Sequence, residues 1–166
     1  GALGDQSLQG LVAVQQYPLG ALPEGDVAAD AVVTDEFATA IEARVVRWLC
    51  DLAGYPATSF GSLVSGGTLA NTTALKIALA ARIPASTRDG LHGLPKRPLL
   101  YASAEAHFSI EKSANVLGLG GQSGYRRVPV HRDSRIDTGA LRTMIAADLA
   151  AGHQPFCVVG IAGVTS

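Results

Sequence analysis

Charged residues are scarce in this chain, and neither sign of charge dominates. Asp, Glu, Lys and Arg make up 16% of its 166 residues, and the formal net charge is −1. Soluble domains usually carry about 25% charged residues. The deficit indicates that much of the surface is covered, by a partner chain or by further sequence. The absence of a basic stripe argues against nucleic acid as a partner.

Cysteines, long apolar runs and metal-ligand clusters are also few or missing. Cys50 and Cys157 are far apart in apolar surroundings, which is typical of buried thiols rather than of a disulfide or a metal pair. No apolar run is long enough to span a bilayer, and no signal peptide with a basic start is visible. No group of His, Cys, Asp and Glu has the spacing of metal ligands. We therefore expect a cytoplasmic protein with no metal site and no membrane partner.

Apolar residues are plentiful, at 48% of the chain, and their spacing predicts alternating helices and strands. Residues 1–33 show no clear periodicity and are interpreted as an N-terminal arm or linker. Spacings of three to four residues predict helices over about 35–52, 68–82, 109–117 and 138–150, beginning at Asp35 or Thr34, Thr68, Ser109 and Asp137. Short apolar runs predict strands at 99–102, 126–130 and 156–162. A polar, proline-containing loop is expected between Pro84 and Pro98.

Two of the predicted helices have a defined apolar face. In the first helix this face consists of Phe37, Ile41, Val45, Leu49 and Leu52. In the second helix one side consists of Ala70, Ala74, Ile77, Ala78 and Ala81. The small residues of the second helix favour close packing against another helix.

The order strand, helix, strand, helix, strand predicts an α/β fold with parallel strands. In such sheets ligands bind outside the carboxyl ends of the strands. Three segments are placed there by this rule: the turn at 66–68, the loop at 103–109 and the last residues, 163–166.

The segment SGGT at 65–68 is the most informative part of the chain. A helix follows it at once, so unpaired N–H groups and the positive end of the helix dipole attract an anion there. Gly66 and Gly67 let a phosphate approach the backbone, and the Thr68 hydroxyl can cap the helix or bind the anion. The same residues also fit a tight turn with an ordinary threonine cap, and this segment alone leaves both interpretations open.

His107 lies in the loop that follows the strand at 99–102. A histidine at the carboxyl end of a strand, beside a phosphate-binding turn, can act as an acid, a base or a ring-stacking group. A histidine that only bonds nearby backbone at a helix start fits the same position, and the position alone favours that reading.

Three motifs together resemble the pyridoxal-phosphate-dependent amino-acid decarboxylases of group II, the aromatic amino-acid and glutamate decarboxylase relatives. They are SGGTLAN at 65–71, YASAEAHFSIEK at 101–112 and PFCVVGIAGVT at 155–165. The resemblance implies the large domain of a fold-type I pyridoxal enzyme, with a parallel-rich sheet and flanking helices. It covers 34–166, the first part of that cofactor-binding domain, so the domain is incomplete in this chain.

The resemblance also implies roles for individual residues. Gly67 and Thr68 match positions that bind the cofactor phosphate, while Ser65 and Gly66 shape the turn. His107 matches a catalytic histidine that stacks on the cofactor ring and helps to orient the substrate carboxylate.

One further position of the resemblance lies near the end of the chain. Thr165 matches a threonine beside the cofactor. Val164 stands where the family usually has threonine, which removes any hydroxyl contact from that position.

The family also needs a lysine for the resting Schiff base and an aspartate opposite the pyridine nitrogen, both later in its sequence order. Lys76, Lys96 and Lys112 do not match that lysine and are interpreted as solvated. We therefore expect a second chain or a further segment to bring both groups, in a dimer or hetero-oligomer.

Three hypotheses follow from the resemblance. The first is one piece of an L-amino-acid decarboxylase that removes the α-carboxylate of its substrate through an external aldimine, and that is inactive as this chain alone. The second is another carbon–carbon lyase reaction on the same scaffold. The third is a non-catalytic, truncated module that binds a phosphate ligand or modulates a full-length partner. We favour the first.

Overall fold

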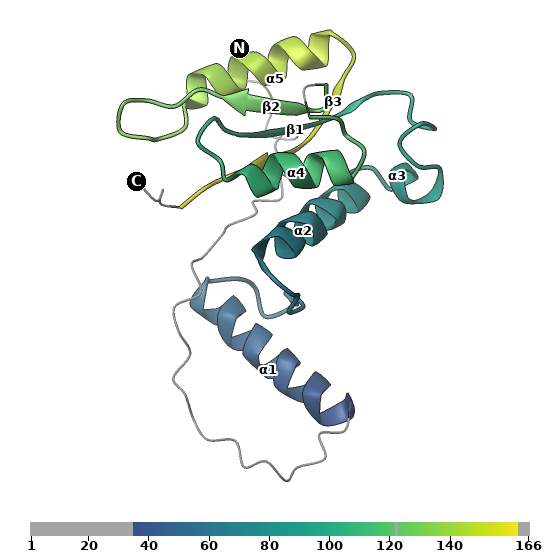
Figure 1. Ribbon diagram of the computed structural model, residues 1–166, viewed down its shortest axis with the longest axis vertical. Helices are drawn as coiled ribbons and strands as arrows, with labels where there is room; N and C mark the ends of the chain where they lie inside the picture. The colour runs from purple at the N-terminus through teal and green to yellow at the C-terminus, as the bar shows by residue number, and fades with distance from the viewer. Residues whose placement is uncertain (1–34, 122, 163–166) are drawn as a thin grey trace. The chain divides into compact units, whose positions relative to one another are not determined.

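The structure is a computed structural model, and it describes residues 35–121 and 123–162 (Figure 1). The described residues fall into two compact units, 35–65 and 66–162. The interpretation of 1–33 as an arm, and the expectations for Val164 and Thr165, lie outside the described residues.

The first unit contains one helix, α1 (Asp35–Leu52), and the loop that follows it. Gly54 ends the helix with a φ of 74°, a left-handed conformation that favours glycine. The Tyr55 N–H donates to the Cys50 carbonyl at 2.8 Å, and the Gly54 N–H donates to the Asp51 carbonyl at 3.1 Å. This pair of bonds is the Schellman arrangement that closes many helices, so the predicted end of the helix is confirmed.

Two charged side chains of α1 hold the following loop against the helix. The Arg47 guanidinium donates to the Ala57 carbonyl at 2.9 Å. A Glu42 carboxylate oxygen accepts from the Leu63 N–H at 2.6 Å and from the Ser62 hydroxyl at 2.9 Å. The bond from the Leu63 backbone, followed by that from Ser62, lowers the pKa of Glu42. The loop is thus fixed by polar bonds more than by a core.

The described residues of the predicted apolar face of α1 are largely exposed within this unit, and the side chain of Phe37 lies outside the described residues. Ile41, Leu49 and Leu52 are 48%, 52% and 87% exposed, and among the side chains described for residues 39–52 Val46 is the buried hydrophobic one. Periodicity identifies residues that share a face, but burial needs a second element, and one loop cannot cover a five-turn helix.

The second unit is built on three parallel strands in the order β2-β1-β3. Their bounds are β1 (Pro98–Ser103), β2 (Tyr125–Val128) and β3 (Gln154–Val159). In the register, Leu100 is paired with Tyr125 on one side, and Tyr101 with Val158 on the other. The prediction of a parallel sheet is confirmed.

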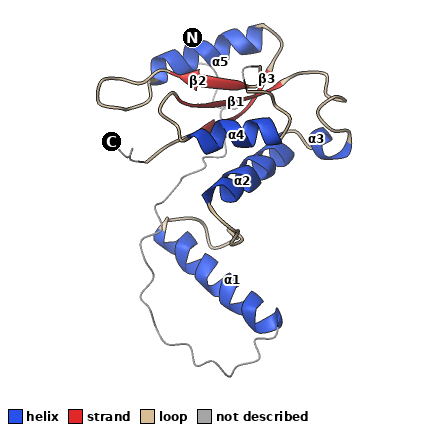
Figure 2. Cartoon of the chain, in the orientation of Figure 1, coloured by secondary structure: helices blue, strands red, loops and turns tan. Residues whose placement is uncertain are grey.

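Helices cover both faces of this sheet, as Figure 2 shows. The helices are α2 (Gly67–Arg82), α4 (Phe108–Val116) and α5 (Thr138–Ala150), with a short α3 (Ala85–Arg88) in the loop predicted before β1. Every residue of β1 is buried. Leu100 and Ala102 pack with α2 and α4, whereas Leu99 and Tyr101 pack on the face that α5 covers. Successive side chains of β1 point to opposite faces of the sheet, and they therefore contribute to two separate hydrophobic cores.

The buried face of α2 differs from the predicted one. The buried residues are Asn71, Leu75, Ala78 and Leu79, whereas Ile77 is 60% exposed. Of the residues predicted to share a side, Ala78 alone is fully buried, while Ala70 and Ala81 are exposed. Alanines are common on every side of this helix, so their spacing did not mark the core face, and the larger Leu75 and Leu79 decide it.

A polar network ties α5 to the sheet. The Tyr101 hydroxyl donates to Asp148 at 2.7 Å, and the Arg126 guanidinium donates to both carboxylate oxygens, at 3.0 and 3.1 Å. Burial by itself raises the pKa of Asp148, but the bonds from Arg126 and Tyr101 outweigh it, so that this pKa lies below its usual value. The ionised carboxylate is therefore the form that the fold favours.

Tyr101→Phe is expected to lower the free energy of unfolding by about 1.5–3 kcal/mol at neutral pH, because it removes a hydrogen bond to a charged group. Asp148 has a lowered pKa in the folded state, so its contribution is present above about pH 4, the unfolded value, and is lost as the pH falls through the folded value. The difference between variant and wild type should shrink in acid. Denaturant unfolding at several pH values measures it, with Tyr125→Phe as the control. An equal loss in both variants would contradict the assignment.

The two cysteines and the charges complete the description of the fold. Cys50 and Cys157 both remain thiols, half-buried and buried respectively, and burial raises the pKa of Cys157 to about 12.

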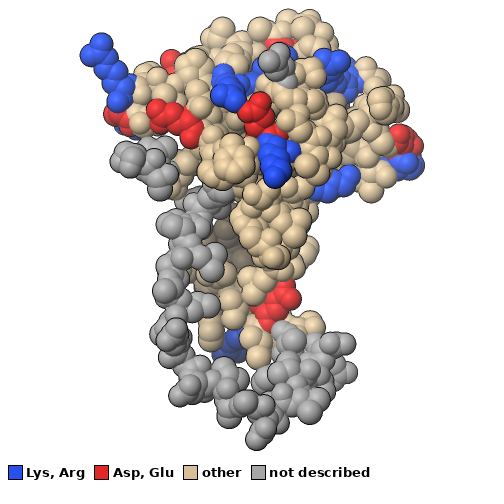
Figure 3. Space-filling view, viewed as in Figure 1, with Lys and Arg blue, Asp and Glu red and all other residues tan. Residues whose placement is uncertain are grey.

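Acidic and basic side chains are interspersed on the visible face in Figure 3. Among the described helices, none combines the length and the apolar character that a membrane crossing requires.

Candidate active site

The turn at the start of α2 leaves backbone N–H groups open. Gly66 is the N-cap residue, with φ 85° and ψ 154°, a conformation that is essentially restricted to glycine. The first bond of the helix runs from the Ala70 N–H to the Gly66 carbonyl at 3.1 Å. The N–H groups of Gly67, Thr68 and Leu69 precede that bond, so they point out of the helix end without an intrahelical acceptor.

Thr68 does not cap this helix, which corrects one of its two predicted roles. The helix begins at Gly67, and its N-cap has no side-chain hydrogen bond. Because Gly66 turns the chain, Thr68 already lies in the first helical turn, where its carbonyl accepts from the Thr72 hydroxyl at 2.9 Å. The other predicted role, a hydroxyl offered to an anion, stays a prediction.

There is room for a ligand at this turn. A Cβ built on Gly66 or on Gly67 would meet nothing within 4 Å. Both residues and Thr68 are exposed. Ser65, also exposed, is the last residue of the first unit. An open glycine turn with free N–H donors fits a phosphate group, because an anion can reach the backbone there.

His107 follows β1 and is the N-cap residue of α4. Its Nδ1 accepts from the Ser109 N–H at 3.3 Å and lies 2.8 Å from the Ser109 hydroxyl oxygen. The cap is therefore His107, not Ser109, which corrects the predicted start of this helix. The contact expected of a histidine that bonds nearby backbone is present.

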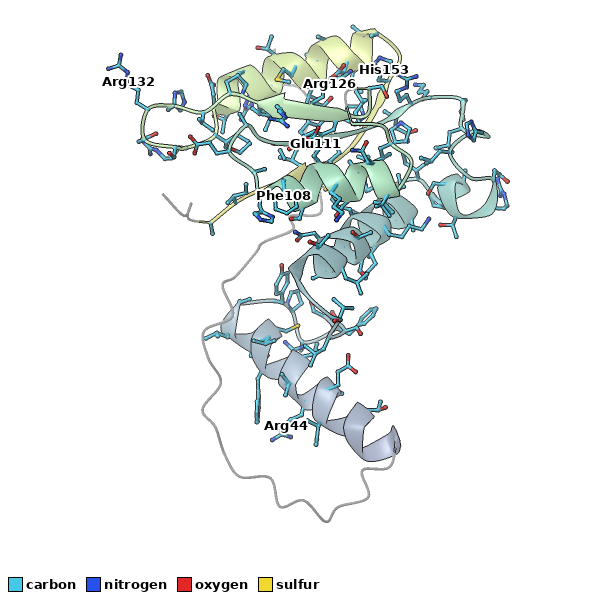
Figure 4. The ribbon with its side chains drawn as sticks, viewed as in Figure 1. Arg44, Phe108, Glu111, Arg126, Arg132 and His153 are labelled. Carbon is cyan, nitrogen blue, oxygen red and sulfur yellow. The ribbon has the colours of Figure 1, made fainter. Side chains whose placement is uncertain are left out.

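The His107 side chain is exposed, and its ring centroid lies 4.3 Å from that of Phe108. Phe108 marks the beginning of α4 in Figure 4. An exposed imidazole at the carboxyl end of β1 has one ring nitrogen committed to the helix cap and retains Nε2 for a ligand.

Two hydrogen bonds join α2 to α4. The Asn71 side-chain amide donates to the Ser109 hydroxyl at 2.8 Å, and the Thr72 and Ser113 hydroxyls lie 2.8 Å apart. Asn71 is one turn into α2, and Ser109 is in the first turn of α4. These bonds bring the open turn and His107 to the same end of the sheet, as the rule for parallel strands predicts.

No side-chain role in the site was assigned from the sequence to Asn71, Ser109 or Ser113, although Asn71 and Ser109 lie within the motifs that carry the resemblance. A signal was present, since Asn71 is the polar member of a series with Leu75 and Ala78 at spacings of four and three. A buried polar side chain in such a series needs a hydrogen-bond partner. Its partner was not identifiable, because Ser109 is 38 residues away.

Lysines and metal ligands are placed as follows. Lys76 on α2, Lys96 in the loop before β1 and Lys112 on α4 are all exposed, which confirms that they are solvated. Over the described ranges, no group of three or more His, Cys, Asp and Glu side chains is arranged to hold a metal ion.

Comparison with known proteins connects this geometry to a family. The profile of the "Pyridoxal-dependent decarboxylase conserved domain" matches residues 29–166. The chain is 33% identical over 126 residues to an aromatic-L-amino-acid decarboxylase of Bacillus atrophaeus, covering 76% of this chain and 24% of the relative. It is 36% identical over 129 residues to an L-2,4-diaminobutyrate decarboxylase of Rhizobium meliloti (strain 1021), covering 78% and 24% respectively.

A solved structure agrees with the sequence relatives. Mouse CSAD in its apo form matches with a TM-score of 0.69 and 32% identity, over 75% of this chain and 26% of that one. The expected fold class, the large domain of fold-type I pyridoxal enzymes, is confirmed.

The chain spans about a quarter of the length of the curated relatives that it matches. The matched profile takes in the open turn of α2, His107 and all three strands, and the cofactor of proteins with this domain is pyridoxal phosphate. The chain belongs to the pyridoxal-dependent decarboxylase family.

Proposed function

We propose that this chain forms part of an L-amino-acid decarboxylase that uses pyridoxal phosphate to remove the α-carboxylate of its substrate. The observation that carries the proposal is the open glycine turn of α2 at the same end of the sheet as His107. The two sequence relatives from Bacillus atrophaeus and Rhizobium meliloti are both named as amino-acid decarboxylases, which supports this reaction over another carbon–carbon lysis.

The turn supplies the phosphate site in this proposal. The N–H groups of Gly67 and Thr68 donate to the phosphate, the Thr68 hydroxyl adds a further donor, and Ser65 and Gly66 hold the turn open. Because these donors stand at a helix N-terminus, the positive end of the helix dipole strengthens each bond to the anion. Thr165 is proposed as a further contact beside the ring.

His107 is the proposed catalytic residue. Its ring stacks on the cofactor and its outer nitrogen donates to the substrate carboxylate, which orients the bond to be broken. When bound, pyridoxal phosphate supplies the electron-accepting ring that decarboxylation requires. The protein's own part is orientation and electrostatic stabilisation, and the distance between a fixed turn and a fixed imidazole determines both.

The remaining groups of the site are proposed to come from outside residues 1–166. A lysine that binds the cofactor and an aspartate for its pyridine nitrogen would belong to a further segment or a second chain, in a cytoplasmic dimer or hetero-oligomer. Residues 34–166 would then form the first part of the cofactor-binding domain. Exposed Lys76, Lys96 and Lys112 support this, because none of them has a buried position near the turn.

Reductive labelling tests the proposal. Pyridoxal phosphate followed by borohydride is expected to label one lysine of the assembled enzyme, outside this chain, and no specific lysine when the chain is treated alone. Peptide mapping by mass spectrometry identifies the labelled residue. Specific labelling of Lys76, Lys96 or Lys112 would refute the division of roles, and failure of every assembly that contains this polypeptide to take up the cofactor would refute the function.

A further inference from the structure

A chain of short contacts runs from the interior of α2 to the His107 ring. The Asn71 side-chain amide donates to the Ser109 hydroxyl at 2.8 Å, and that hydroxyl lies 2.8 Å from His107 Nδ1. Asn71 is 2% exposed and Ser109 is 1% exposed, whereas His107 is exposed. The chain therefore connects a buried amide to a ring at the surface of the proposed site.

The direction of each hydrogen bond follows from the groups that take part. A serine hydroxyl has one hydrogen to donate and accepts through its lone pairs. Because the Ser109 oxygen accepts from the Asn71 amide, its own hydrogen is available for His107 Nδ1. The Ser109 backbone N–H also points at this nitrogen, at 3.3 Å. Nδ1 thus faces two donors, and it can accept from them only when it carries no proton itself.

We infer that Asn71 and Ser109 hold the neutral His107 ring in the form that carries its proton on Nε2. Nε2 is the nitrogen that the helix cap does not use, so the ring presents an N–H donor to the site. Asn71 is then a positioning residue, since it acts through Ser109 and touches neither substrate nor cofactor. This inference rests on the proposed function for its consequence: the ring donates a hydrogen bond from Nε2–H to a substrate carboxylate, which can only accept.

The placement of Asn71 supports a specific role over general packing. Asn71 is buried on α2 together with Leu75, Ala78 and Leu79, and a buried amide costs free energy unless it is hydrogen-bonded. The neighbouring bond between Thr72 and Ser113 also joins α2 to α4, at the same length of 2.8 Å, but it does not reach His107. The two bonds can therefore be compared directly: both join α2 to α4, but the bond from Asn71 connects to the His107 ring through Ser109 and the bond between Thr72 and Ser113 does not.

Nitrogen NMR of the histidine rings tests the inference, because the ring nitrogen shifts report which atom is protonated. The full protein is labelled with histidine that carries nitrogen-15 in its ring. It is sedimented for solid-state NMR and examined at a pH where the ring is neutral. The His107 signal is assigned by its loss in His107→Asn. We expect wild type to show the Nε2-protonated form. Asn71→Asp should move the proton to Nδ1, because a carboxylate accepts the Ser109 hydrogen and leaves the oxygen lone pair facing the ring.

Ser113→Ala is the control, since it removes the parallel bond between the same helices, and it should leave the Nε2-protonated form unchanged. If Asn71→Asp does not fold, Asn71→Leu, of similar volume, should give a mixture of both forms. A proton on Nδ1 in wild type, or the wild-type spectrum in a folded Asn71 variant, would overturn the inference. The readout does not need bound cofactor, so failure to bind pyridoxal phosphate, followed by absorbance, would count against the proposed function alone.

Activity gives a second readout in the holoenzyme. Asn71→Asp is expected to lower kcat/KM at least about 10²-fold, because the donor towards the carboxylate is lost. Ser109→Thr, which keeps the hydroxyl, should retain the Nε2-protonated form. Loss of activity without any change in the protonated nitrogen would mean a merely structural role for Asn71.

Discussion

Under the proposed function, His107→Ala is expected to lower kcat/KM of the assembled enzyme by about 10²–10⁴-fold, the range that a positioned acid–base side chain contributes. The substitution also removes the N-cap of α4, because His107 Nδ1 accepts from the Ser109 N–H. Loss of a cap costs about 1 kcal/mol, so the fold should change little. Steady-state kinetics and denaturant unfolding of the same preparation measure the two effects.

His107→Asn separates the two roles of this residue. Asparagine is a favoured N-cap residue, so this variant should recover most of the stability that alanine loses. It has no imidazole, and we expect its activity to stay as low as that of His107→Ala. Near-normal turnover in either variant would remove His107 from the site.

Gly66→Ala is expected to have a large effect on both stability and cofactor affinity. Gly66 has φ 85° and ψ 154°, which a residue with a Cβ adopts only at a cost of about 1–3 kcal/mol. The same turn directs the Gly67 and Thr68 N–H groups outward, so a strained or rearranged turn misplaces the donors of the phosphate. Unfolding experiments measure the first effect, and titration with pyridoxal phosphate measures the second.

Gly90→Ala is the matched control for this substitution. Gly90 also has a positive φ, 68°, and also has open space around the position of a Cβ, but it lies in the turn after α3. Its replacement should destabilise the fold and leave cofactor affinity unchanged. Equal losses of affinity in both variants would mean that the Gly66 effect is one of stability and that the turn is not the phosphate site.

Much of the secondary structure was predictable because its signals are local. The strand at 99–102 is a continuous apolar run, and it is the central, fully buried strand among the described residues. Asp137 was expected to begin a helix, and its carboxylate accepts from the Ala140 N–H at 2.9 Å. A carboxylate held by backbone N–H groups explains the lowered pKa of Asp137. Such caps depend on residues three positions apart, which the sequence displays directly.

The caps at the proposed site were less predictable. Thr68 and Ser109 were both expected to begin their helices, and Gly66 and His107 take those places. Threonine and serine are the usual caps, but a glycine with a left-handed φ and an imidazole can each start a helix. Both exceptions, Gly66 and His107, are residues that the family resemblance assigns to the cofactor site. At these positions the residue differs from the one that helix capping alone would favour.

By itself the sequence determined the family, because the three motifs can be read directly from it. It also determined the order of helices and strands, through the periodicity of apolar residues. That order, with the rule for parallel strands, gave the end of the sheet where the open turn and His107 lie. The tertiary structure alone decided that Asn71, Leu75 and Leu79 form the buried side of α2, and that Asn71 reaches His107 through Ser109. Those facts depend on how α2 lies against α4. That register is set by the packing of side chains 38 residues apart, for which no local spacing gives a signal.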